Sequence, residues 1–142
     1  MAAVALALAM AGEANADLAK AQAEPNLEKR AGLALDNART AYKEAREAYD
    51  KGDNDRAAAA IREIEESVDL AFTSLKATGK DPRSSPKHFK KAEIETRELS
   101  KHLEAFDNAM SFADRPMLEK AKAKVQQVHD DLLLGLMEGK HK

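Results

Sequence analysis

The chain has 142 residues, which is enough for one domain, and it contains no Cys. The lack of Cys excludes disulfides, thiolate nucleophiles, Cys-ligated zinc and haem attached through paired Cys. Charged residues make up 34% of the chain and aromatic residues 4%, a composition typical of proteins built from long helices. A formal net charge of -2 provides no overall field that would attract nucleic acid, so we expect no nucleic-acid partner.

The first 16 residues differ in composition from the rest of the chain. Residues 2–11 are all Ala, Val, Leu or Met, and residues 14–16 (Ala-Asn-Ala) then give the small-x-small pattern of a cleavage site. This pattern predicts a signal peptide over residues 1–16, a mature chain of residues 17–142 and a periplasmic or secreted location. The apolar run is too short to span a bilayer as a permanent anchor. We therefore expect no stable membrane span after the signal peptide is cleaved. No Lys or Arg precedes it, so either the start lies further upstream or these residues form an Ala-rich N-terminal helix.

Four later stretches carry small or apolar residues at alternating steps of three and four, which places one stripe along one side of a helix. Because the connections between the stretches are short, successive helices should run in opposite directions. A lead-in at residues 17–24 precedes them. The predicted fold is therefore all-α, an antiparallel up-down-up-down four-helix bundle, with helices over about residues 26–51, 53–77, 86–110 and 115–138.

Several residues have the chemistry of helix ends. Gly52 is expected to end the first helix in a left-handed conformation, and Asp53 to cap the second. Ser85 and Asp114 are expected to cap the third and fourth helices. Residues 79–86 form the one clear loop.

The stripe of the first helix is mostly Ala, which allows close packing, and Leu35, Tyr42 and Tyr49 supply bulk beside it. Residues 41–60 resemble the junction of a tetratricopeptide repeat, with Tyr, a tight Gly-Asp turn and then Ala. Such repeats need about three copies to bury a core, and no second copy is visible, so an Ala-rich antiparallel hairpin is our interpretation. In the last two helices the stripes predict two facing sets of buried side chains: Leu99, Leu103 and Phe106, and Val125, Val128 and Leu132.

The candidate metal ligands are Glu98, His102 and His129. Glu98 and His102 lie one helical turn apart and have the spacing to share an ion, although they flank the stripe rather than occupy it. A haem-binding bundle would use His129 as one axial ligand, but the first helix contains no Met to supply the other. The alternative is that these His residues are solvated or hydrogen-bonded at the edge of the core, and we expect no cofactor.

Enzyme signatures are absent from the sequence. It has no glycine-rich phosphate loop, and no Cys/His or Ser/His/Asp arrangement follows from the spacing of its residues. We therefore expect the protein not to be an enzyme.

Two surface features are candidate partner-binding sites. Basic residues surround the loop at residues 79–86 and oppose the dipole of the helix that follows it: Lys80, Arg83, Lys87, Lys90 and Lys91. They suit phosphate, an anionic membrane or an acidic glycan, or they form a solvated loop. Apolar residues of the last helix run around more than one face, so the interior takes up only part of them. The remainder, with Leu133, Leu134 and Met137 as candidates, would be exposed unless the lead-in, a second subunit or another partner covers them.

Residues 85–100 (SPKHFKKAEIETRELS) and 111–137 (SFADRPMLEKAKAKVQQVHDDLLLGLM) resemble the C-terminal halves of small exported bacterial all-helical proteins that have no assigned function. The resemblance implies a secreted helical domain and no particular chemistry. The sequence thus favours a non-enzymatic exported helical protein that acts by protein–protein contact, including self-association, or as a structural module. The alternative is a periplasmic metal- or haem-binding carrier that uses His129 or His102.

The predicted signal peptide can be tested directly. Mass spectrometry of the protein expressed in its source cell, with its full upstream region, should find an N-terminus at Asp17. A protein that keeps Met1 and stays in the soluble cytoplasm would contradict the prediction.

Overall fold

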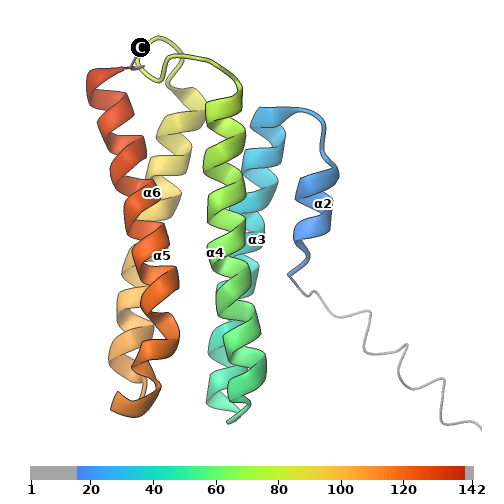
Figure 1. The fold of residues 1–142 in the computed structure, drawn as a ribbon, viewed down its shortest axis with the longest axis vertical. Helices are drawn as coiled ribbons and strands as arrows, with labels where there is room; N and C mark the ends of the chain where they lie inside the picture. Colours follow the sequence, from blue (N-terminus) through green and yellow to red (C-terminus); the bar gives the residue numbers. More distant parts are fainter. Residues whose placement is uncertain (1–15, 140–142) are drawn as a thin grey trace, which may run out of the picture.

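A computed structural model describes residues 16–139 of the chain, so all of the predicted signal peptide except Ala16 lies outside the described residues. The all-α prediction is confirmed, because residues 16–139 contain helices and no strand. Four long helices run side by side, with a short helix beside them (Figure 1). The α-helices are α2 (Leu18–Ala23), α3 (Leu27–Asp50), α4 (Asn54–Ala77), α5 (Lys87–Ala109) and α6 (Glu119–Glu138), and a 3-10 helix, η2 (Phe112–Leu118), precedes α6.

The long helices pack in two closely associated pairs. The most extensive contact joins α3 to α4, and the next joins α5 to α6. Helix α4 also packs on α6, whereas α5 touches α3 and α4 at fewer positions. The lead-in forms α2, which lies against α3 and α4 on the side away from α6 (Figure 1). Within residues 16–139, no helix combines the length and apolar character needed to cross a membrane.

The buried core confirms the predicted helical phase. In α3, Leu35 is 4% exposed, and Tyr42 and Tyr49 pack partly buried against the core. The two facing sets predicted for the last two helices, from Leu99 to Phe106 and from Val125 to Leu132, are all 3% exposed or less. The small residues of the predicted stripe in α3 are also buried, namely Ala31, Ala34, Ala38, Ala41, Ala45 and Ala48.

The turn between α3 and α4 forms as expected. Gly52 has a φ of 79°, a left-handed conformation that glycine adopts without strain. The side chain of Asp53 accepts a hydrogen bond from Arg56 N at 3.1 Å and caps α4. The turn therefore joins the ends of two closely packed helices with three residues.

Two predicted caps are wrong. Ser85 does not cap α5, since Pro86 precedes the helix and no described side chain caps it, while Ser85 N donates to Asp81 O at 2.8 Å within the loop. Asp114 does not cap a helix beginning near residue 115, because its carboxylate accepts from Tyr49 Oη at 2.9 Å and Ser111 Oγ at 2.8 Å. The chain there forms η2, and α6 begins four residues later than predicted.

The core assignment predicts a contrast between two adjacent residues of α5. Leu103 is 1% exposed, so Leu103→Ala should lower the free energy of unfolding by about 2–5 kcal/mol. The Glu104 side chain is 68% exposed, so Glu104→Ala should change it by less than about 0.5 kcal/mol. Urea unfolding followed by circular dichroism measures both changes, and equal effects would contradict the helical phase.

Candidate functional site

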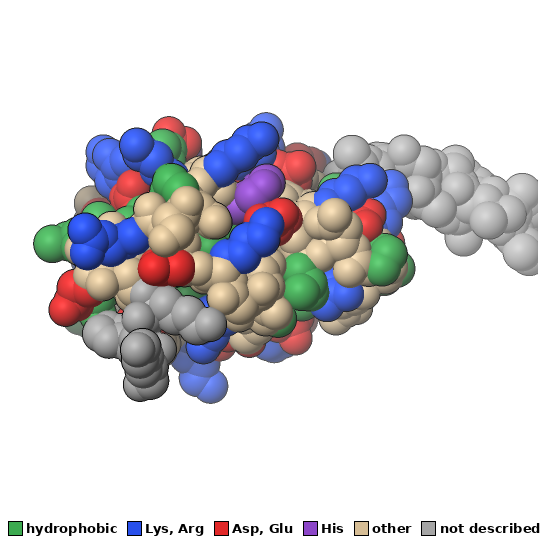
Figure 2. All heavy atoms as spheres, turned by 90° about the horizontal axis from the view of Figure 1, so that it is seen from above, with side chains coloured by type: hydrophobic (Ala, Val, Ile, Leu, Met, Phe, Trp, Pro, Cys, Tyr) green, Lys and Arg blue, Asp and Glu red, His purple; other side chains and the backbone are tan. Residues whose placement is uncertain are grey.

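The predicted partner-binding residues gather mainly at one end of the molecule. We call this the loop end: the connection between α4 and α5 (residues 78–86) together with the last turns of α6 (residues 131–139). It lies at the top of Figure 1, and Figure 2 looks onto it. Lys and Arg side chains extend from much of this face, with acidic side chains between them (Figure 2).

An apolar pocket of about 360 Å³ opens at the loop end. Its lining includes Phe72 of α4, Phe89 of α5 and Leu134 of α6, so it lies where three long helices meet the loop. Lys76 and Lys80 also line it, and the Lys76 ammonium lies 4.7 Å from the centre of the Phe72 ring. Such a pocket suits an apolar group with negative charge beside it.

Pro82 separates this pocket from a second one of about 370 Å³, which Arg83, Lys90 and Leu133 help to line. Pro82 can lie against α6 because residue 135 is Gly, where a Cβ atom would come within 3.2 Å of the Pro82 Cγ atom. The glycine therefore allows the loop to pack on α6 and helps to shape both pockets.

The structure divides the five predicted basic residues into two groups. Lys80, Arg83 and Lys90 line the two apolar pockets. Lys87 and Lys91 lie toward α3, where their charges act on Glu28 and Glu95 respectively. Lys80 is also engaged on that side, since its Nζ atom lies 2.9 Å from Glu28 Oε2.

The apolar residues at the end of α6 are exposed. Leu133, Leu134 and Met137 are 40%, 45% and 67% exposed. Of the alternatives for covering them, the lead-in is excluded, because α2 packs only on α3 and α4 in the described part of the chain. Helix α2 lies there because Ala21, which is 1% exposed, is docked on the opposite side of the domain.

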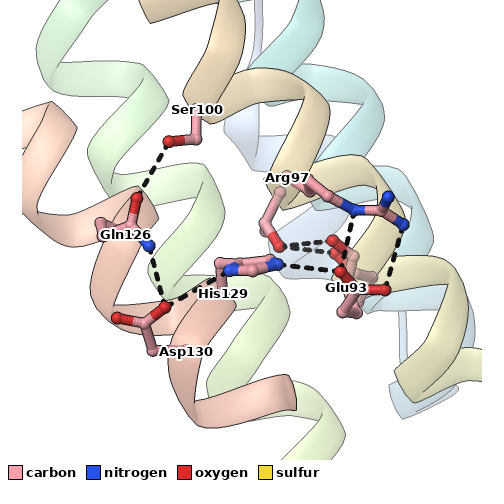
Figure 3. Close-up of polar contacts among 8 residues, drawn as sticks. Glu93, Arg97, Ser100, Gln126, His129 and Asp130 are labelled. Carbon is pink, nitrogen blue, oxygen red and sulfur yellow. Dashed lines mark hydrogen bonds and ion pairs between the residues drawn. The ribbon is translucent and has the colours of Figure 1, made fainter. Parts of the chain in front are cut away.

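A group of hydrogen-bonded polar side chains connects α5 to α6, and it includes His129, one of the candidate metal ligands. His129 Nε2 lies 2.8 Å from Glu93 Oε2, and Glu93 also binds Arg97 Nε at 3.0 Å (Figure 3). His129 Nδ1 faces Asp130 Oδ1 at 3.4 Å. Both ring nitrogens therefore lie near carboxylates, which makes His129 a structural link between the helices rather than an open ligand.

The electrostatics of Glu93 follow from these contacts. Its side chain is 12% exposed, and this burial alone would raise the pKa of Glu93. The hydrogen bonds from His129 and Arg97 outweigh burial and hold the pKa of Glu93 below its ordinary value. The ionised carboxylate is thus the form that the fold stabilises.

The other candidate metal ligands are not brought together with His129. Glu98 and His102 are exposed, and the His102 ring stacks on Tyr42 with 5.2 Å between ring centres. Ser100 Oγ is 3.2 Å from Gln126 Oε1, so these two polar residues bind each other (Figure 3). Across residues 16–139, no three His, Asp or Glu side chains are placed to hold a metal ion. A carrier function therefore stays a prediction with no geometric support from these residues.

Sequence reasoning missed Glu93, although the signal was available. His129 lies 16 residues after Ala113, in the connection between the last two helices. An equal count back from Ala113 reaches Arg97, one turn from Glu93. The spacing therefore places His129 within one helical turn of Glu93 across the two helices.

Comparisons with known proteins do not assign this chain to a family. No family model, curated protein or solved structure matches it. The resemblance to exported bacterial helical proteins therefore stays a prediction, and the function has to be argued from the surface.

The link between Glu93 and His129 predicts a pH-dependent stability. Because the pKa of Glu93 is lowered on folding, its contribution is present at neutral pH and is lost as the pH falls through the lowered folded-state pKa. Glu93→Gln should lower the free energy of unfolding at pH 7 by about 1 kcal/mol, a figure reduced for partial solvent screening. The difference from the unmodified protein should shrink as the pH is lowered, and it should disappear once Glu93 is protonated in both the folded and the unfolded state.

Urea titrations at pH 3 and pH 7 would measure this difference. Glu98→Gln is a matched control, since Glu98 lies on the same helix and is exposed. An equal loss of stability in both variants at pH 7 would show that the link between Glu93 and His129 contributes nothing specific.

Proposed function

We propose that this protein is a non-enzymatic exported helical protein, periplasmic or secreted, that binds an acidic segment of a partner protein at its loop end. Its architecture in this proposal is an antiparallel up-down-up-down four-helix bundle. Pairing between α5 and α6 supports that topology: Lys122 lies 3.4 Å from Asp107 near their connection, and His129 binds Glu93 further from it. In antiparallel helices, a residue further along the second helix pairs with a residue further back along the first, as these two pairs do.

The observation that carries the proposal is the apolar pocket beside exposed leucines. Phe72, Phe89 and Leu134 line a pocket that the described residues leave open, and Leu134 continues from it onto the surface. Its neighbour Leu133 lines the second pocket across Pro82. An apolar side chain inserted there would remove apolar surface from water at about 25 cal/mol per Å², which favours a protein ligand with an apolar anchor.

The charge around the pockets supports an acidic partner. Lys76, Lys80, Arg83 and Lys90 line the two pockets, although Asp131 also contributes to the first. Glu93 likewise contributes to the second pocket, where His129 and Arg97 bind it. In addition, the start of α5 has no acidic residue in its first turn and no side-chain cap from the described residues. Carboxylates of a partner would complement both the basic side chains and the positive end of this helix.

A photo-crosslinking amino acid placed at residue 134 tests this proposal in the native envelope fraction. We expect it to crosslink to one protein, through a peptide that combines an apolar residue with Asp or Glu. Leu134→Lys should weaken binding of that purified partner at least tenfold, because it places a charge in the apolar contact. Arg83→Glu with Lys90→Glu should do the same by reversing the charge.

Phe112→Lys is the matched control, since Phe112 is an 85% exposed apolar residue outside the loop end, and it should bind as the unmodified protein does. Circular dichroism checks that each variant keeps its helices. A crosslink to a second copy of this chain, or equal binding by all variants, would overturn the proposed partner contact.

A further inference from the structure

We propose that cleavage between Ala16 and Asp17 creates an N-terminal ammonium group that the folded domain binds through Asn37 and the carboxylates of Glu44 and Glu63. The inference rests on the export step of the proposed function, which supplies the cleavage. The nitrogen atom that would become this ammonium is already docked in the structure, as the peptide nitrogen of Asp17.

The acceptor for this nitrogen is fixed in its orientation. Asp17 N donates to Asn37 Oδ1 at 2.7 Å, and Asn37 is 9% exposed on α3. The Asn37 amide nitrogen donates to Glu63 Oε2 at 2.9 Å and to Ser67 Oγ at 3.0 Å. Because an ionised carboxylate only accepts hydrogen bonds, the amide must turn its nitrogen toward Glu63 and its oxygen toward Asp17. The pocket thus presents a preset acceptor to the Asp17 nitrogen.

A second carboxylate holds the neighbouring backbone nitrogen. Ala16 N donates to Glu44 Oε1 at 3.1 Å. Cleavage after Ala16 removes this donor from Glu44 and at the same time converts the Asp17 nitrogen from one N–H group to an ammonium with three. The new group can keep its bond to Asn37. Carboxylates are near it, since Glu44 binds the adjacent Ala16 N and Glu63 binds the nitrogen of the same Asn37 amide.

These carboxylates lack a positive partner in the described chain. Burial raises the pKa of Glu63 above its ordinary value, the hydrogen bond from Asn37 opposes this, and the charges of Glu44, Asp17 and Glu66 add to it. Among the residues from 16 to 139, no Lys, Arg or His forms an ion pair with Glu44 or Glu63. A positive charge on the Asp17 nitrogen would relieve this repulsion in a partly buried site, where ion pairs are screened less than at the surface.

Contacts made by Asp17 and the residues after it also hold this nitrogen in position. The Asp17 carboxylate accepts from Ala19 N at 3.0 Å and caps α2. Ala21 of α2 is 1% exposed and belongs to the core. Packing of α2 therefore holds Asp17 in place whether or not residues 1–16 are attached.

The test compares one folded protein before and after cleavage. In the full chain, the residues just before Asp17 are replaced by the recognition sequence of a protease that cuts immediately before Asp17. We expect the cut to raise the melting temperature at pH 6.5 by about 3 °C or more. The pKa of the new N-terminus, measured by NMR titration, should lie above its ordinary value of about 8. Since this pKa is raised on folding, the added stability should be lost as the pH rises through it.

Two controls make the result specific. A chain cut three residues earlier carries the same charge away from the site and should show neither change. Glu63→Gln should remove most of the gain on cutting, whereas Glu65→Gln, on the same helix, should keep it. An unchanged melting temperature, an ordinary N-terminal pKa, or equal gains for both cut positions would overturn the inference.

This experiment is separate from the test of export. If the source cell leaves residues 1–16 attached, the export step of the proposed function is wrong, while the cut chain still shows whether the site binds an ammonium. If the cell cleaves before Asp17 and the cut chain gains no stability, export stands and the ammonium site does not.

Discussion

The close contact between α3 and α4 is the constraint on which the rest of the structure depends. The buried stripe of α3 is mostly Ala, from Ala31 to Ala48, and Ala57, Ala60 and Ala71 are buried on α4. Small side chains let the two helix backbones approach closely, and a buried Ala loses almost no side-chain entropy on folding. Such a surface contributes little apolar area per residue, so larger side chains from α5 and α6 must complete the core. Phe106, Leu103 and Val125 do this, each 1% exposed or less.

Helix α5 packs mainly on α6 and touches α3 and α4 at few positions. Polar side chains at the edges take part in holding it. Glu93 binds His129 of α6, and on the other side Glu95 binds Arg39 of α3 at 2.6 Å. Burial raises the pKa of Glu95, and the Arg39 charge opposes this. The two acids thus face opposite neighbours. The ionised form is favoured for Glu93, which receives hydrogen bonds from His129 and Arg97. It is disfavoured for Glu95, which is partly buried and binds Arg39.

The helices and the core followed from sequence because spacing alone determines which residues share a helix face. The stripe from Leu99 to Phe106 is readable without any knowledge of the neighbouring helix. The caps of α5 and α6 were not readable in this way. Asp114 has the chemistry of an N-cap, but the hydroxyl of Tyr49, 65 residues away, binds it instead. The contact between Glu93 and His129 likewise required the register of two helices, which depends on packing rather than on either stripe.

The buried polar residues show why the lead-in docks where it does. Thr96 bonds back to Ala92 O of its own helix at 2.8 Å, so it needs no partner elsewhere. Asn37 differs, because its side chain bonds to α4 and also reaches Asp17 before α2. Apolar packing of Ala21 alone would let α2 slide along the Ala-rich surface of α3, whereas the directional hydrogen bond that Asp17 N donates to Asn37 Oδ1 fixes its register. A groove beside α2 is lined in part by Asp17, Glu63 and Glu66. It shares no lining residue with the apolar pocket at the loop end, so the two surfaces are separate. A partner at the loop end and a charged N-terminus at α2 can therefore act on the same domain without competing for a contact.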